Sequence, residues 1–181
     1  NIIGTLRVFE AMQKHNIHKI IFASSMSVYA NSTQPTPIHE KSRTEPISPY
    51  GIGKYSAEQY LLRLCELYEK SCTILRYFNT YGPGQHSSPY VGVINTFIDN
   101  VLDKKPITIF GDGHQLRDYI HVSDIVCANV LAMEHDTQHD IFNIGTGIGT
   151  SVNTLAKEIM ELTGQTTKIE YAQKRKEELE Y

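Results

Sequence analysis

A tyrosine, a lysine and a pair of serines stand where they could act together on a carbinol oxygen. Tyr50 and Lys54 are four residues apart, so on a helix they share one face, and the ammonium can lower the pKa of the phenol toward neutrality. Ser24 and Ser25 follow the run at 19–23 and would lie at the tip of a buried strand, where a hydroxyl can hydrogen-bond the same oxygen. This arrangement suits hydride removal or addition at a carbon that carries a hydroxyl group.

Alternating helical and extended segments surround these residues. Residues 4–16 carry apolar side chains on a helical period, and residues 19–23 form a short β-rich run. A loop rich in proline, threonine and serine at 31–45 precedes a helix that begins at Pro49 and runs to about residue 70. A continuous apolar strand follows at 72–77. This order predicts an α/β fold with a doubly wound parallel sheet, with the tyrosine and lysine on a helix and the serines at a strand end.

The chain changes character after residue 82, where loops become longer and strands shorter. The expected elements there are helices within 91–102, 123–133 and 151–164, and strands at 106–110, 115–120, 141–144 and 168–172. Ser123 or Asp124 is expected to cap the second of these helices, and Ser151 the third, which would end at Gly164.

Bulk composition excludes several classes of function. The chain has 181 residues, 40% hydrophobic composition and a formal charge of -3, which favours a globular domain without a general attraction to nucleic acid or anionic membranes. Cys65, Cys72 and Cys127 lack metal-ligand spacing, so we expect free thiols in a reducing compartment and no metal site. No apolar run reaches the roughly 20 residues of a membrane helix, and no signal peptide opens the chain, so we expect a cytoplasmic location.

Longer motifs along nearly the whole chain support a specific resemblance. Beyond the serine pair and Ser48-Pro49-Tyr50-Gly51, they are Asn1-x-x-Gly4-Thr5, Leu75-Arg76-Tyr77-Phe78-Asn79-x-Tyr81-Gly82-Pro83, Ile109-Phe110-Gly111-Asp112-Gly113, Arg117-Asp118-Tyr119-Ile120-His121-Val122-x-Asp124 and Phe142-Asn143-Ile144-Gly145. The set resembles the extended short-chain dehydrogenase/reductase family, and within it the NAD-dependent nucleotide-sugar epimerases related to UDP-glucose 4-epimerase. The resemblance implies a Rossmann-like fold, NAD as cofactor and a UDP-sugar as substrate.

The resemblance also assigns chemical roles. Tyr50 would take the proton from the sugar 4-hydroxyl, and Ser25 would hydrogen-bond the same oxygen. Lys54 would bind the hydroxyls of the nicotinamide ribose, and Tyr77 would pack near the carboxamide of NAD. Ser24 is grouped with the cofactor-binding positions, although we expect its hydroxyl to have a backbone partner at the strand end.

The nucleotide part of the substrate has its own matching positions. Arg117 and Arg175 correspond to two arginines that bind the diphosphate, for which a guanidinium fork is well suited. Asn79 would add an amide donor, while Phe110 and Val93 would line the base. His121 and Asp124 are interpreted as structural.

Two neighbours of the serine pair bear on which reaction is catalysed. Dehydratases of this superfamily place an aspartate and a glutamate where this chain has Met26 and Ser27, so dehydration is disfavoured, and sugar decarboxylation becomes less favoured with it. The alternatives that remain open are another nucleotide-sugar reaction, such as 2-epimerisation, decarboxylation or reduction, and a non-catalytic nucleotide-sugar-binding protein of the same fold.

The resemblance also divides the chain. Residues 1–82 would form the C-terminal half of the Rossmann domain and 83–181 mainly the substrate lobe, with 115–147 partly returning to the first. No glycine-rich turn for the NAD pyrophosphate follows a strand, so we expect a longer protein whose front carries that turn and the residue that distinguishes NAD from NADP. A homodimer through helices 4–16 and 49–70 is implied as well.

Overall fold

The computed structural model describes residues 1–32, 34–85, 92–135 and 139–174. These residues form two compact units that interleave along the sequence. The first unit consists of Asn1–Asn31, Pro37–Phe78 and Ser123–Ile144, and the second takes the other described residues. Each unit has its own sheets and its own apolar core.

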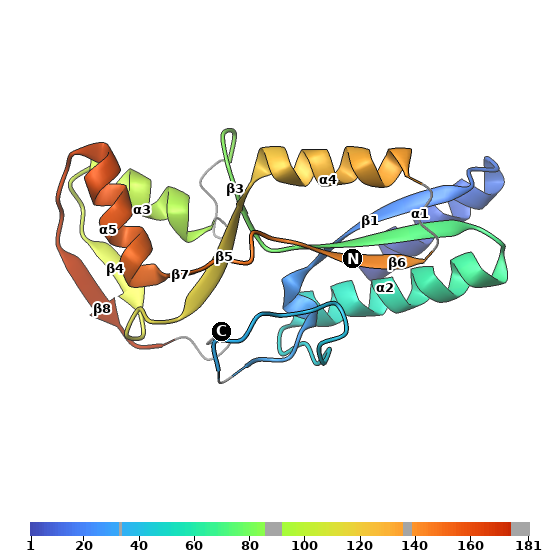
Figure 1. Cartoon of the computed structure of the whole chain (residues 1–181), viewed down its shortest axis with the longest axis horizontal. Helices are drawn as coiled ribbons and strands as arrows, with labels where there is room; N and C mark the ends of the chain where they lie inside the picture. Colours follow the sequence, from blue (N-terminus) through green and yellow to red (C-terminus); the bar gives the residue numbers. More distant parts are fainter. Residues whose placement is uncertain (33, 86–91, 136–138, 175–181) are drawn as a thin grey trace. The chain divides into compact units, whose positions relative to one another are not determined.

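The first unit is built on a parallel sheet with helices on both faces. Its strands are β1 (Lys19–Ser25), β2 (Ser71–Tyr77) and β6 (Asp140–Ile144), in the order β1-β2-β6. Figure 1 shows α4 (Val122–Glu134) on one side of this sheet and α1 (Ile2–Lys14) and α2 (Pro49–Leu67) on the other. Parallel strands need covering on both faces, and the expected doubly wound α/β arrangement is therefore confirmed for this part of the chain.

The core of the first unit lies between the sheet and the helices α1 and α2. Its buried members come from both helices and from the middle strand: Phe9, Met12, Leu61, Cys65, Cys72 and Ile74. Cys72 and Ile74 alternate along β2 with side chains of the other face, and the next position on the helix-facing side is Arg76. An arginine thus continues an apolar row into the buried part of the sheet.

The second unit carries shorter strands and two helices. Its strands β3 (Asn79–Tyr81), β5 (Leu116–His121) and β7 (Gly149–Ser151) pair in that order, and β4 (Ile107–Phe110) pairs in parallel with β8 (Ile169–Ala172). The helices α3 (Val93–Leu102) and α5 (Val152–Thr163) pack with β4 around buried Phe97, Val101, Ile107, Ile109, Leu155 and Ile159.

The N-terminal cap predicted from the sequence is confirmed for α5 and wrong for α4. Ser151 caps α5, because its Oγ accepts a hydrogen bond of 3.0 Å from Thr154 N, and Gly164 ends the helix at a φ of 64°. The prediction that Ser123 or Asp124 caps α4 is wrong. That helix begins at Val122, directly after β5 ends at His121, so both residues lie inside its first turn.

Candidate active site

The first turn of α2 carries the tyrosine and lysine to the carboxyl end of β1. Ser48 starts the helix, because its Oγ accepts a hydrogen bond of 3.0 Å from Gly51 N, and Pro49 follows at the first helical position. Lys54 Nζ lies 5.8 Å from the centroid of the Tyr50 ring. The Tyr50 side chain is half exposed.

Lys54 fastens this helix to the strand beside it. Its Nζ donates a hydrogen bond of 2.7 Å to the carbonyl oxygen of Ala23 and lies 5.1 Å from the centroid of the Phe22 ring. Partial burial disfavours the charged form and lowers the pKa of Lys54. The ammonium is therefore held next to the phenol ring in a partly dehydrated position.

The two serines at the end of β1 have different surroundings. Ser25 caps the short 3₁₀ helix η1 (Met26–Val28): its Oγ accepts from Ser27 N at 3.2 Å and lies 3.1 Å from Ser27 Oγ. Ser24 is buried, and its hydroxyl donates to the carboxylate of Glu58. The prediction of a backbone partner for Ser24 is therefore wrong, because strand alternation turns this side chain toward α2, and we leave it out of the cofactor contacts.

Gly51 permits the close approach of η1 to α2. A Cβ atom at this position would lie 2.2 Å from the carbonyl oxygen of Ser27, which is closer than real Cβ atoms come, and 3.0 Å from Cβ of Pro46. A hydrogen at Cα is thus the largest group that fits between the helix and the turn. The spacing of Tyr50 and Lys54 did not reveal this role for Gly51.

Tyr77 ends β2 on the opposite face from Arg76. Its backbone pairs in register with Ser25, and its hydroxyl donates a hydrogen bond of 2.9 Å to Asn129 Oδ1 on α4. Burial raises the pKa of Tyr77, and the bond with Asn129 opposes that effect. The end of β1, the end of β2 and the start of α2 therefore gather Ser25, Tyr77, Tyr50 and Lys54 at one edge of the parallel sheet.

The second unit holds those described residues that are predicted to bind the nucleotide: Asn79, Val93, Phe110 and Arg117. Asn79 lies on β3 and pairs with Tyr119, so it shares a sheet face with Arg117, two positions away on β5. Asn79 Nδ2 donates to Asp118 O at 3.3 Å, and Arg117 donates to Leu116 O at 2.7 Å. Arg175 lies outside the described residues.

Phe110 and Val93 begin or end elements of the same unit. Phe110 is the last residue of β4 and is half buried, while Val93 opens α3 and packs on the core. The loop after Phe110 is braced by Asn153, whose Nδ2 donates to Asp112 O at 2.9 Å. A Cβ at Gly113 would lie 2.2 Å from Asn153 Oδ1, and Gly113 has a φ of 76° that favours glycine.

The described residues offer neither a metal site nor a membrane-spanning helix. Among the described residues, no group of three or more His, Cys, Asp or Glu side chains could hold a metal ion. None of the helices in the described part of the chain is both long and apolar enough to cross a membrane.

Comparison with known proteins identifies the family. The family described as "NAD dependent epimerase/dehydratase family" matches residues 1–145. The chain belongs to this family. It is similar to the solved UDP-glucose 4-epimerase of Thermotoga maritima with UDP-glucose, at 42% identity and a TM-score of 0.94, over 99% of this chain and 58% of that one.

Further members of the family show the same likeness. The UDP-glucose 4-epimerase of Halalkalibacterium halodurans is 35% identical over 97% of this chain and 57% of its own length. The Thermus thermophilus UDP-glucose 4-epimerase, solved in complex with NAD, is 30% identical with a TM-score of 0.90, over 98% of this chain and 58% of that one. The chain spans about half the length of the curated relatives it matches.

Proposed function

We propose that this chain is the catalytic part of an NAD-dependent epimerase that inverts C4 of a UDP-hexose, whether plain, N-acetylated or a uronate. The observation that carries the proposal is the gathering of Tyr50, Lys54 and Ser25 at the carboxyl edge of a parallel sheet. Ligands of doubly wound folds bind at this edge. The similarity to UDP-glucose 4-epimerases over nearly the whole chain supports the same reaction class.

The donor set at this edge fits a nicotinamide nucleotide. An ammonium has three donors and Ala23 O takes one from Lys54, so the same group can also bind the two hydroxyls of a ribose. Tyr77 would pack beside the carboxamide. NAD bound there would supply the acceptor for a hydride from C4 of the sugar and the donor of a hydride for the other face of the same carbon.

The protein's own residues move the proton. Tyr50 as phenolate takes the proton of the sugar 4-hydroxyl while the C4 hydride leaves, which gives a 4-keto sugar, and returns the proton when the hydride comes back. Ser25 Oγ hydrogen-bonds the same oxygen in both directions. The ammonium of Lys54 stabilises the phenolate, and partial burial strengthens that attraction because less water screens it.

The second unit would bind the nucleotide. Arg117 and Arg175 would hold the diphosphate, Asn79 would donate to it, and Phe110 with Val93 would line the base. The brace that Asn153 gives to the loop after Phe110 supports a fixed aromatic surface there.

We also propose a homodimer through α1 and α2. These helices expose several large apolar side chains, among them Ile3, Val8, Tyr60 and Leu67. A pair of such helices from each subunit would bury them in a two-fold interface. Light scattering after size exclusion should give twice the subunit mass, and a monomeric mass would contradict the dimer.

A product assay tests the reaction. The full-length protein is incubated separately with UDP-galactose, UDP-N-acetylgalactosamine and UDP-galacturonate, and the products are followed by NMR. We expect the 4-epimer of at least one substrate, with retention of every carbon. Loss of carbon dioxide, a 2-epimer or a reduced sugar would each replace the proposal by that reaction. Tight binding of the sugar nucleotides without turnover would instead indicate a non-catalytic binding protein.

A further inference from the structure

A buried ion pair joins α2 to β2 close to the candidate active site. Arg76 on β2 and Glu58 on α2 have exposed fractions of 2% and 0%. The guanidinium donates two hydrogen bonds to the carboxylate, from Nη2 to Oε2 at 2.6 Å and from Nε to Oε1 at 3.0 Å. Such a fork fixes distance and orientation together, because both parallel bonds must be kept.

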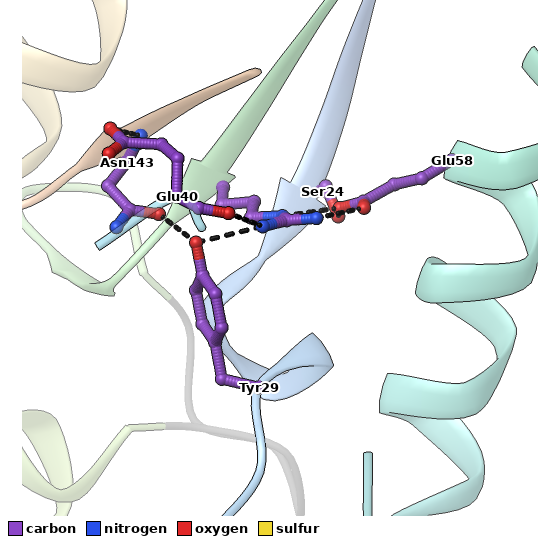
Figure 2. A network of polar contacts seen from close by, with 6 residues as sticks. Ser24, Tyr29, Glu40, Glu58 and Asn143 are labelled. Atoms are coloured by element: carbon purple, nitrogen blue, oxygen red, sulfur yellow. Dashed lines mark hydrogen bonds and ion pairs between the residues drawn. The ribbon is translucent and has the colours of Figure 1, made fainter. Parts of the chain in front are cut away.

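Further hydrogen bonds hold both members of the pair, as Figure 2 shows. Arg76 Nη1 donates to the hydroxyl of Tyr29 at 2.9 Å and to the carbonyl oxygen of Glu40 at 3.2 Å, while Ser24 donates to the Glu58 carboxylate. The guanidinium carbon also lies 4.8 Å from the centroid of the Tyr29 ring. The ion pair is therefore held from the end of β1, from the loop before α2 and from the residue after η1.

A further set of bonds extends the network to the third strand of the sheet. The hydroxyl of Tyr29 donates to Asn143 Oδ1 on β6 at 2.6 Å. Asn143 donates from Nδ2 to Ile38 O at 3.0 Å and from its backbone N to Glu40 Oε1 at 2.9 Å. All these groups belong to the first unit.

Three members of this network are close neighbours of candidate site residues. Ser24 precedes Ser25, and Arg76 precedes Tyr77, while Ser24 and Arg76 pair in register. Glu58 stands one helical turn after Lys54 on the same face of α2. A small rotation or slide of α2 against the strands would thus move the reactive groups and break the fork at once.

The energetics of the pair favour positioning over stability. Dehydrating two charges costs free energy that their attraction largely offsets, and apolar residues of similar volume often replace a buried pair with no loss of stability. Apolar contacts, however, do not set the axial position of a helix as a bidentate fork does. The feature that the charges add here is a defined register between α2 and the strand ends.

We propose that Arg76 and Glu58 are positioning residues that set the placement of Tyr50 and Lys54 relative to Ser25. The inference rests on the proposed function, since it assigns the pair to the geometry of that site. The two residues touch neither substrate nor cofactor in this scheme. Their contribution to turnover passes through α2.

The test replaces the pair as a whole in the full-length protein. The double variant Arg76→Met with Glu58→Met removes both charges and keeps unbranched side chains, so neither charge is left unpaired. We expect a kcat lowered by about 10- to 100-fold with a KM changed by less than about threefold, because geometry is lost while binding groups remain. The matched control, Arg63→Met with Glu66→Met, removes an exposed ion pair from the same helix and should leave kcat unchanged.

A second readout does not depend on turnover. Acetylation of Lys54, followed by peptide mass spectrometry, should become at least about threefold faster in the double variant, since the helix no longer holds the ammonium at Ala23 O. Lys157 on α5 is the internal reference and should react at the wild-type rate. Wild-type protein that forms no 4-epimer would overturn the proposed function alone, and the acetylation ratio would still decide the role of the pair.

A third variant covers the case in which the double variant does not fold. Arg76→Lys keeps a charge opposite Glu58 but lacks the fork, so we expect a smaller fall in kcat and an intermediate rate of Lys54 acetylation. Either folded variant with wild-type kcat and wild-type Lys54 acetylation would overturn the inference.

Discussion

Two rows of residues, one position apart at the ends of the same three strands, have opposite characters. The first row is Ser24, Arg76 and Asn143, whose backbones pair across β1, β2 and β6. Its side chains lie in a buried or half-buried network of hydrogen bonds. The second row begins with Ser25 and Tyr77 in the same register, at the sheet edge where α2 starts with the half-exposed Tyr50.

The difference shows how one strand end can serve as both anchor and site. Because successive side chains point to opposite faces, the row that faces α2 can be fixed by charge-assisted bonds while its neighbour presents hydroxyl groups. Under the proposed function, holding α2 in place and contacting the substrate would be separate tasks of adjacent residues. Substitutions in the two rows should accordingly change different quantities.

The largest expected effect comes from removing the proposed proton carrier next to the second row. Tyr50→Phe in the full-length protein should lower kcat by about 10² or more, the scale for losing a positioned acid or base. Tyr68→Phe, at the half-exposed tyrosine that follows the same helix, is the matched control and should keep wild-type kcat. Steady-state kinetics measure both, and near-normal turnover of Tyr50→Phe would refute the assignment.

The two serines test the comparison most directly. Ser25→Ala should lower kcat by about 10²-fold, since it removes a hydrogen bond to the reacting oxygen, and should lower the free energy of unfolding by only about 0.5–1 kcal/mol, because η1 loses its half-buried cap. Ser24→Ala should leave kcat within about threefold but lower the free energy of unfolding by about 1–3 kcal/mol, because Glu58 loses a buried donor. Steady-state kinetics and thermal unfolding of both variants measure these two effects. The reverse pattern would show that the roles of the rows have been exchanged.

Two glycines of α2 test how closely the site must be packed. Gly51→Ala places a methyl group 2.2 Å from Ser27 O, so η1 and the helix must separate. We expect kcat to fall by up to about tenfold, because the reactive groups of the site are misplaced. The free energy of unfolding should fall by about 1–3 kcal/mol. Gly53→Ala meets only the flexible Asn1 side chain at 3.4 Å and should raise stability by about 0.5–1 kcal/mol with unchanged kcat. Equal behaviour of the two variants would contradict the close-approach role of Gly51.

The smallest effect concerns the exposed end of the first row. The bond from Asn143 N lowers the pKa of Glu40 below its ordinary value of 4.5. A carboxyl group with a lowered folded-state pKa stabilises the protein above its unfolded pKa, and this stability is lost as the pH falls through the folded value. Glu40→Gln should therefore be less stable than wild type by under about 1 kcal/mol near pH 7, and equally stable in more acid solution. Thermal unfolding across this pH range measures the difference, and a constant difference would exclude the carboxylate as its cause.

The helices, the longer strands and the close pairing of Tyr50 with Lys54 could be predicted from local patterns. A period of 3.6, a proline at the first helical position and a serine cap are properties of a few consecutive residues, and they sufficed for α2 and α5. The strands β3 and β7 were not predicted. Each has three residues, and each exists only because β5 lies beside it.

The buried network could not be derived from spacing. Glu58 and Arg76 are 18 residues apart and Tyr29 and Asn143 are 114 apart, so their contacts depend on how the whole unit folds. One signal was available, because Arg76 interrupts an apolar strand between Leu75 and Tyr77, and a buried guanidinium must be paired. That signal would have indicated a partner but not which carboxylate supplied it.

Because the two units interleave along the sequence, the first unit cannot be completed until part of the second has been synthesised. The first 78 residues contain β1, β2 and α2, but β6 arrives only after Asn79–Val122 has been made for the other unit. At ordinary elongation rates the nascent chain waits roughly 3 to 13 seconds for residue 144. During that interval one side of β2 has no neighbouring strand, and the Tyr29 hydroxyl has no amide oxygen to accept its hydrogen bond. A chaperone or a slowed ribosome would matter most in this window, when an unfinished sheet edge is open to pairing with another chain.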